Sequence, residues 1–366
     1  MKGAKIDKPF LFITLLLIAF GSLIFFSASL GLLAKETNNY SSVAFSQAVL
    51  GLCLGMVALL VATHLDYRYW KKFALAIFLI AIILNILVLI PSIGVEHGGA
   101  KRWLEVGPFS FQPSEVLKFG FIIYFAAWLS SVKDRVRTFR WGFLPLVVLL
   151  GIAGSLLLSQ PDTDTFLIIV IAGVAMFIAA GGRWRWVMLL GVIGIVGLLG
   201  LAFTRPYVMR RISSFLNPTS DSLGASYQIQ QSLIAIGSGE FSGRGFGQSI
   251  QKFTYLPEPV GDSIFAVAAE EFGFIGSLAL VALFSLFATR GLKIASNLPN
   301  PFARLTVVGI VIMIISQAFV NIGAMLGVLP LSGITLPFVS HGGTSLFMSL
   351  LEAGIILSIS RIIPKS

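Results

Sequence analysis

The first long apolar segment of the chain, residues 10–34, reads FLFITLLLIAFGSLIFFSASLGLLA and contains no charged residue. A helix that crosses the hydrocarbon core of a membrane needs roughly 20 apolar residues, so this segment is long enough to span. Three lysines precede it, as in a secretory signal, but the run exceeds a signal-peptide core and no A-x-A site closes it. We therefore expect this segment to remain in the protein as a membrane helix.

Nine further apolar runs follow along the chain: 43–63, 73–93, 114–132, 143–159, 165–181, 187–203, 263–289, 305–328 and 344–363. Of the 366 residues, 56% are hydrophobic and 11% are charged. Soluble domains carry about a quarter charged residues, so this composition excludes a soluble enzyme. It predicts a single all-α polytopic membrane domain over residues 1–366, with about ten transmembrane helices.

The basic residues predict the orientation of these helices. If every run crosses the membrane, most of the 26 Lys and Arg residues lie on the side of the N-terminus. Because basic residues concentrate on the cytoplasmic side, both termini are predicted to be cytoplasmic. The net charge of +10 is then an orientation signal, and no nucleic acid partner is expected. With Cys53 as the only cysteine and three scattered histidines, neither an intrachain disulfide nor a histidine metal site is expected.

Two long polar segments then lie outside, residues 91–113 and the larger loop 204–262. The larger loop carries a series of cations and amides: Arg205, Arg210, Arg211, Gln228, Gln231, Arg244, Gln251 and Lys252. Such side chains either are solvated or contact lipid head groups, or they bind phosphate through arginine forks. The glycines of 243–247 lack the ending of a nucleotide-binding loop, so we reject a nucleotide site there.

A few charged residues fall within the predicted spans, where each one costs on the order of 3 kcal/mol. Glu115 and Lys118 are three residues apart, a spacing that puts them on one helix face. They form either a structural ion pair or the lining of a cavity. The other three are acids: Glu270, Glu271 and Glu352.

Asp262 stands at the start of the eighth run, after the sequence PEPVG. One interpretation is a helix N-cap, because aspartate is a preferred residue there. The other is a carboxylate at the outer membrane face, with a pKa near the usual value of about 4, which could accept a proton from a sugar hydroxyl. The residues alone leave both interpretations open.

Several short motifs, taken together and in order, resemble one known family. They are GAKRWL at 99–104, FQPSEVLK at 111–118, QPD at 160–162, YQ at 227–228, QSLIAIGSG at 231–239, GRGFG at 243–247, LPE at 256–258, DSIFAV at 262–267 with the glutamates at 270–271, and LPFVSHGGTS at 336–345. The resemblance is to the SEDS (shape, elongation, division, sporulation) family of peptidoglycan glycosyltransferases. The QK pair at 251–252 and the PFVS-x-GGTS ending look more like the division branch than the elongation branch.

The resemblance implies a function and a set of roles. The chain would polymerise lipid II into β-1,4 glycan strands at the outer face of a bacterial cytoplasmic membrane during division, together with a class B penicillin-binding protein transpeptidase. Asp262 would be the catalytic base. Other residues would bind substrate: Arg102, Trp103, Arg210, Arg211, Gln231, Lys252 and Glu258. Glu115 and Lys118 would shape the cavity floor. No cofactor is firmly implied, and a divalent cation at the pyrophosphate is left open.

The sequence also departs from the family pattern at three places. It has Val260 and Gly261 where a His-Thr pair usually precedes the aspartate, Asp164 in place of a glycine, and His341 in place of a tyrosine. The aspartate itself is kept, so the expected base survives. Any role of the neighbouring His or Tyr side chains is in doubt.

Two other functions compete with the enzyme. A lipid II flippase or transporter would use the charged residues inside the spans as its pathway. That function needs polar groups that continue to the inner face, whereas the motifs here lie mostly at the outer side. A non-catalytic division scaffold would need no base at all.

Overall fold

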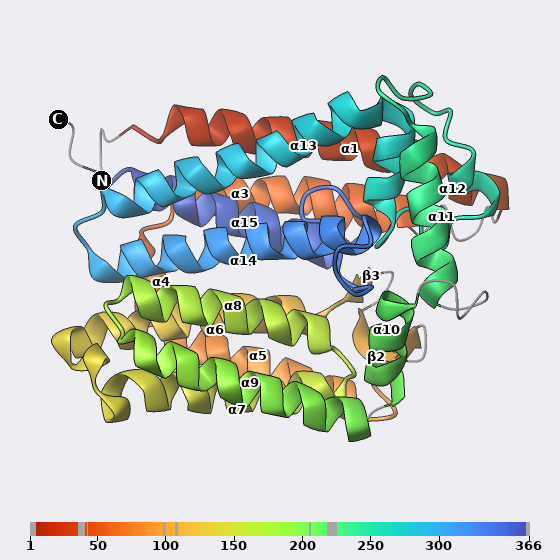
Figure 1. Cartoon of the computed structure of the whole chain (residues 1–366). Coiled ribbons are helices and arrows are strands. Elements are labelled where there is room, and N and C mark those ends of the chain that lie inside the picture. Colours follow the sequence, from red (N-terminus) through yellow and green to blue (C-terminus); the bar gives the residue numbers. More distant parts are fainter. Residues whose placement is uncertain are drawn as a thin grey trace.

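The computed structural model describes residues 5–35, 41, 43–97, 100–106, 109–204, 206–217 and 225–363. Gly99 and Arg205, which the sequence singled out, lie outside these residues. The long helices in the described part run alongside one another in one bundle (Figure 1).

The first half of the chain supplies six of the membrane-type segments and a small sheet. The helices are α1 (Lys8–Lys35), η1 (Ser46–Leu54) continued by α3 (Gly55–His64), α4 (Tyr67–Lys72), α5 (Ala74–Leu89), α6 (Pro113–Val132), η2 (Lys133–Arg137), η3 (Phe139–Phe143), α7 (Leu144–Ser159) and α8 (Thr163–Ala179). The strands are β1 (Gly94–His97), β2 (Ala100–Val106) and β3 (Phe109–Phe111).

The second half contains three helices outside the membrane-type segments and four long ones. The former are α10 (Pro206–Leu216), α11 (Ala225–Ser238) and α12 (Gln251–Thr254). The latter are α9 (Trp184–Thr204), α13 (Ile264–Ser296), α14 (Pro301–Met325) and α15 (Gly343–Ser360).

Within the described residues, eight helical segments are long and apolar enough to cross a membrane, and the two shorter apolar helices are α5 and α8. All ten coincide with the runs predicted from the sequence, so the polytopic helical fold is confirmed. The prediction of an all-α chain was wrong in one place. Strands β1, β2 and β3 form an antiparallel sheet in which Trp103 pairs with Val95 and Glu105 with Ser110.

The interior of the bundle lies around α14 and α15. Helix α14 packs against α6, α8, α13 and α15, and most of its side chains are buried. Local sequence fixes where it begins, since Pro301 occupies the first turn and Asn300 Oδ1 accepts a hydrogen bond from the Ala303 amide at 3.2 Å. Helix α9 is almost wholly exposed and apolar, as expected for a span that faces lipid.

The sheet and helices α10, α11 and α12 gather at one end of the bundle, and the two termini lie at the other (Figure 1). Hydrogen bonds hold the termini together. The Asp7 amide donates to Ser360 Oγ at 3.0 Å, and the Arg290 guanidinium donates to both Asp7 oxygens at 2.9 and 2.7 Å. The polar end and the terminal end are therefore opposite ends of one bundle.

A kink divides α13 close to its N-terminal end. Gly273 has a left-handed backbone, with φ of 65°, that glycine adopts without strain. Gly243, with φ of 82°, lies directly against it, and neither position has room for a Cβ atom. The amides of Arg244 and Gly245 donate to the carbonyls of Glu270 and Glu271, both at 3.0 Å. Gly243 thus packs on a helix backbone, while Gly245 and Gly247 have left-handed backbones, with φ of 104° and 80°, so the glycines of this loop are explained without a ligand.

Candidate functional site

Asp262 lies in the turn before α13, at the polar end of the molecule. Its backbone is fixed from α14, because Asn321 Nδ2 donates to the carbonyls of both Asp262, at 2.9 Å, and Ile334, at 2.7 Å. The N-cap interpretation was wrong. Ser263 occupies the cap position of α13, and no side chain caps that helix.

Three charged side chains converge on Gly333, in the segment between α14 and α15. A Cβ placed on Gly333 would lie 3.7 Å from Arg102 Nη1, from Arg211 Nη2 and from Asp262 Oδ2. Gly333 is exposed, so the space that these groups surround opens to the outside. The structure therefore brings together two predicted cations and the predicted base from β2, α10 and the α13 turn.

Backbone carbonyls of the α7–α8 connection position Arg102. Its Nε donates to the Gln160 carbonyl at 3.2 Å, and its Nη2 donates to the Pro161 carbonyl. Asp162 Oδ1 lies 4.0 Å from Arg102 Nη1 and also accepts from the Thr165 amide at the start of α8. The QPD motif at 160–162 thus fixes the position of this guanidinium through two backbone carbonyls and one carboxylate.

Asp164 positions Arg211, and sequence reasoning did not place it in the site. Its Oδ2 lies 2.6 Å from Arg211 Nη1 and accepts from the Gly333 amide at 3.0 Å. One carboxylate therefore joins α8, α10 and the Gly333 segment. The available signal was a second acid, two residues after the QPD aspartate, where the family pattern has glycine.

Burial, together with the charges of Glu258 and Asp164, raises the pKa of Asp262 to about 7. Arg211 and Arg102 act in the opposite direction and lower this pKa. The expectation of an ordinary pKa near 4 was therefore wrong, since burial disfavours the charged carboxylate. Near neutral pH the group interconverts readily between its acid and base forms.

Glu258 lies beside Asp262 and shapes the turn that carries it. It has a left-handed backbone, with φ of 46°, and its carbonyl accepts from the amides of Gly261 and Ser263 at 3.1 and 3.2 Å. Its side chain is exposed, which leaves the carboxylate free to meet a ligand.

Three other predicted substrate residues lie on neighbouring elements. Trp103 is half-buried in β2, Arg210 is exposed on α10, and Gln231 is half-buried on α11. Within the described part of the chain, none of the three forms a hydrogen bond or ion pair with Arg102, Arg211 or Asp262. Arg210 and Arg211 diverge because neighbours on a helix point about 100° apart.

Lys252 is not part of this group, and its predicted contact with substrate is corrected by the structure. Its side chain is fully buried, and its Nζ lies 2.6 Å from Glu271 Oε1 and 3.0 Å from Ser27 Oγ. Glu270 binds the same segment, accepting from Ser249 Oγ at 2.5 Å and from the Ile250 amide at 3.0 Å. A buried ammonium that is already paired cannot meet a ligand outside.

Glu115 and Lys118 form a buried pair inside the bundle, with 2.8 Å between Oε1 and Nζ. Lys118 also donates to Gln317 Oε1 at 2.6 Å, and Gln317 Nε2 donates to the Thr335 carbonyl at 2.9 Å. Thr335 is two residues from Gly333. A continuous polar chain therefore connects the pair to the segment on which the three charged groups converge.

His341 contacts the turn that carries Asp262 through its backbone, and its ring packs against α1. Its amide donates to the Val260 carbonyl at 2.7 Å, and its ring stacks on Phe25 with centroids 6.3 Å apart. Burial lowers its pKa to about 4, so the imidazole is neutral at physiological pH.

Among the described residues, no group of three or more His, Cys, Asp or Glu side chains is arranged to hold a metal ion. Asp164, one of the acids near Asp262, is paired with Arg211. A cation held between substrate phosphates and one or two carboxylates is a different kind of site, and we assign no step to one.

Known relatives match along nearly the whole chain. The "Cell cycle protein" family of FtsW, RodA and SpoVE matches residues 8–363. Stage V sporulation protein E of Bacillus subtilis (strain 168) is 39% identical over 360 residues, covering 98% of each chain. The probable peptidoglycan glycosyltransferase FtsW of Geobacter sp. (strain M18) is 38% identical over 354 residues, covering 97% of this chain and 96% of that protein.

Solved structures share the fold. The rod shape determining protein RodA of Thermus thermophilus superposes with a TM-score of 0.71 at 26% identity, covering all of both chains. A chain from a structure described as a peptidoglycan synthase complex that coordinates polymerization and crosslinking gives a TM-score of 0.78 at 28% identity, covering 97% of this chain and 98% of that one. With these matches and the site above, the chain belongs to the FtsW/RodA/SpoVE family, also known as SEDS.

Proposed function

We propose that this protein is a peptidoglycan glycosyltransferase that polymerises lipid II, with Asp262 as its general base. The observation that carries the proposal is the convergence of Asp262, Arg102 and Arg211 around Gly333 at the open, polar end of the bundle. The names of the FtsW relatives support the same reaction class.

The reaction needs a base and a cation, and the site offers both. The 4-hydroxyl of one lipid II attacks the anomeric carbon of the growing chain, whose bond to the pyrophosphate oxygen breaks with inversion. Asp262 takes the hydroxyl proton, and the bond electrons leave with the polyprenyl pyrophosphate. A positioned base contributes typically 10²–10⁴ in rate.

Arg102 and Arg211 are suited to the leaving group. Their guanidiniums are held from behind, Arg102 by backbone carbonyls and Arg211 by Asp164, while Nη atoms of each face the Gly333 space. Arginine forks bind phosphate oxygens bidentately, and fixed cations stabilise charge that develops in the transition state. Arg210, Trp103, Gln231 and Glu258 then lie where they can contact sugar, peptide or lipid.

The raised pKa of Asp262 suits this role. A base works best when its pKa is near the operating pH, because it is then both partly ionised and basic enough to hold a proton. A carboxylate with a pKa near 4 would be ionised more fully but would be a weaker base.

The cellular setting is part of the proposal. We place ten spans in the cytoplasmic membrane, both termini inside, Asp262 outside, and the protein at the division site with a class B penicillin-binding protein. The charge distribution supports the orientation. The structural similarity to a chain of a synthase complex that coordinates polymerization and crosslinking supports a crosslinking partner.

A flippase remains the second candidate function because the chain from Glu115 and Lys118 through Gln317 to Thr335 extends polarity into the bundle. One experiment separates the candidates. Purified protein, with and without a class B penicillin-binding protein, is given fluorescent lipid II, and glycan length is read on gels. Polymer from wild type and none from Asp262→Asn supports the enzyme. Lipid II transport into vesicles without polymer supports the flippase, and neither activity supports a scaffold.

A further inference from the structure

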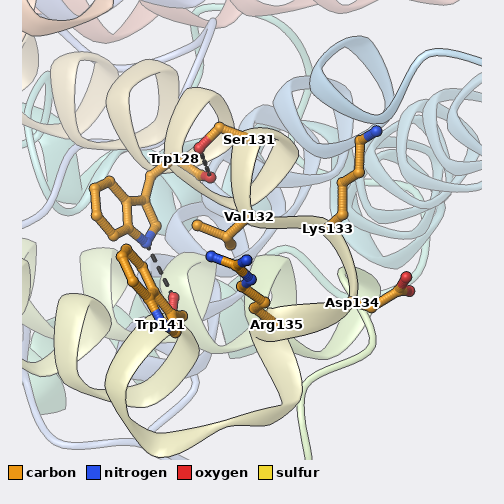
Figure 2. A pocket seen from close by; sticks show the side chains of 7 residues that line it. All are labelled: Trp128, Ser131, Val132, Lys133, Asp134, Arg135 and Trp141. Atoms are coloured by element: carbon orange, nitrogen blue, oxygen red, sulfur yellow. Dashed lines mark hydrogen bonds between the residues drawn. The ribbon is translucent and has the colours of Figure 1, made fainter.

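A pocket lies where α6 passes through η2 into η3 (Figure 2). This part of the chain is at the end of the bundle where the termini lie, opposite the sheet (Figure 1). It has a volume of about 640 Å³ and is lined by Trp128, Ser131, Val132, Lys133, Asp134, Arg135 and Trp141. The proposed reaction uses none of these residues.

Two tryptophans make the wall of this pocket. Their rings are stacked with centroids 6.2 Å apart, and Trp128 Nε1 donates to the Trp141 carbonyl at 3.1 Å. The guanidiniums of Arg135 and Arg140 each lie 5.7 Å from the centre of the Trp141 ring. Figure 2 shows Arg135 beside the two rings, while Lys133 and Asp134 point away. An aromatic wall and its cations are therefore already assembled.

The positive charge of the segment between α6 and α7 is not neutralised by ion pairs. Residues 133–140 contain four cations and one acid, and within the described ranges none of the four cations forms an ion pair. A smaller adjoining pocket of about 240 Å³ is lined by Arg137 and Arg304, and Arg304 Nε is buried without a hydrogen-bond partner. Both pockets thus offer donors that lack an anion.

The position favours a lipid over a soluble ligand. Phe139 and Leu144 are exposed beside the pocket, at the beginning of a membrane-type segment, so the pocket adjoins the surface that acyl chains cover. Tryptophan is enriched at the level of lipid head groups, and arginine forks match phosphate oxygens. We propose that this pocket binds the phosphate-bearing head group of an anionic phospholipid from the leaflet on the side of the termini, with Arg135 on the phosphate, Arg140 adding positive charge from beside Trp141, and the tryptophans against the glycerol and acyl carbons.

Lipid binding to the purified full-length protein tests this. Native mass spectrometry would count phosphatidylglycerol and phosphatidylcholine bound to wild type and to the double variant Arg135→Gln/Arg140→Gln. We expect wild type to retain phosphatidylglycerol selectively, and the double variant to lose roughly tenfold or more in affinity. The matched control Lys71→Gln/Lys72→Gln removes two exposed cations from α4 and should bind like wild type.

Each remaining outcome overturns the proposal. Equal retention of both lipids, or an equal loss in the α4 control, would mean nonspecific attraction. Inorganic phosphate that competes at the concentration of the lipid would indicate a free-anion site, and displacement by an acidic peptide would indicate a protein partner. Circular dichroism melting of both double variants confirms that exposed substitutions leave the fold intact.

Discussion

The group around Gly333 and the group around Lys252 contain the same kinds of side chain in opposite circumstances. Around Gly333, Asp262, Arg102 and Arg211 are half-buried and turn polar atoms toward a shared open space. Around Lys252, the ammonium and Glu271 are fully buried and 2.6 Å apart. The first group can receive a substrate, whereas the second is closed and holds the 249–252 segment on α1 and α13. Residue type alone does not show whether a charged group binds a ligand or stabilises the fold. The two groups differ in whether their polar atoms face open space or one another.

The largest effect on activity is expected at Asp262, in the open group around Gly333. Asp262→Asn removes the base without changing shape, so polymerisation of lipid II should fall by about 10²–10⁴. Glycan gels with purified protein and its transpeptidase partner measure this. Glu240→Gln, an exposed acid at the same end, is the matched control and should keep full activity. Substantial polymer from Asp262→Asn would remove Asp262 from the role of base.

Substitutions in the closed group around Lys252 should lower the stability of the fold. Lys252→Met leaves Glu271 buried and unpaired, which costs about 3–5 kcal/mol. The melting temperature in detergent should fall clearly, whereas Lys293→Met, at an exposed position, should leave it unchanged. Lys252→Met/Glu271→Gln should recover part of the loss because no unpaired charge remains. An unchanged melting temperature for Lys252→Met would mean that the pair is not structural.

The two adjacent arginines of α10 sharpen the comparison. Arg211 faces the Gly333 space, whereas Arg210 is exposed and points about 100° away around α10. Arg211→Gln should therefore lower the polymerisation rate by about 10², the usual loss for one charge-stabilising donor. Arg210→Gln should cost much less. Rates at saturating lipid II compare the two variants, and equal losses would argue against a special position for Arg211.

The smallest effect concerns pH. Asp262 must be ionised to act as a base, so activity should rise with pH through about 7 and be lost below it. Asp164 raises this pKa by its negative charge, and Asp164→Asn should therefore move the acidic limb to lower pH, by about one unit or less. A limb that stays in place or moves upward would contradict the assigned influence of Asp164.

The sequence was sufficient to predict the helical segments, because a long apolar run has few alternatives to a membrane helix. It also placed Asp262, Arg102 and Arg211 in external segments whose meeting the structure shows. Their convergence on Gly333 depends on how β2, α10 and the α14–α15 segment pack, which no local pattern encodes. The sheet was not predicted because strands β1, β2 and β3 are short and are defined by their pairing with one another.

Lys252 and Asp164 show what the sequence pattern does not reveal about the site. Lys252 lies in a long polar segment, which favours an accessible cation, but that segment folds back so that Ser27 and Glu271 enclose the side chain. Asp164 looked like a variation at the end of a span, yet it binds Arg211 and the Gly333 amide. Burial and partner choice are tertiary properties, and both corrections follow from them.

The contact of Asp7 with Ser360 and Arg290 limits how the chain can thread the bilayer. A chain whose first span begins and whose last span ends at the same face crosses an even number of times. The eight long segments give an even number, and adding both α5 and α8 gives ten. At 1.5 Å per residue these two helices are only about 24 and 26 Å long, a few Å short of a typical hydrocarbon core. Parity nonetheless couples them: if the eight long segments all cross, α5 and α8 cross together or not at all.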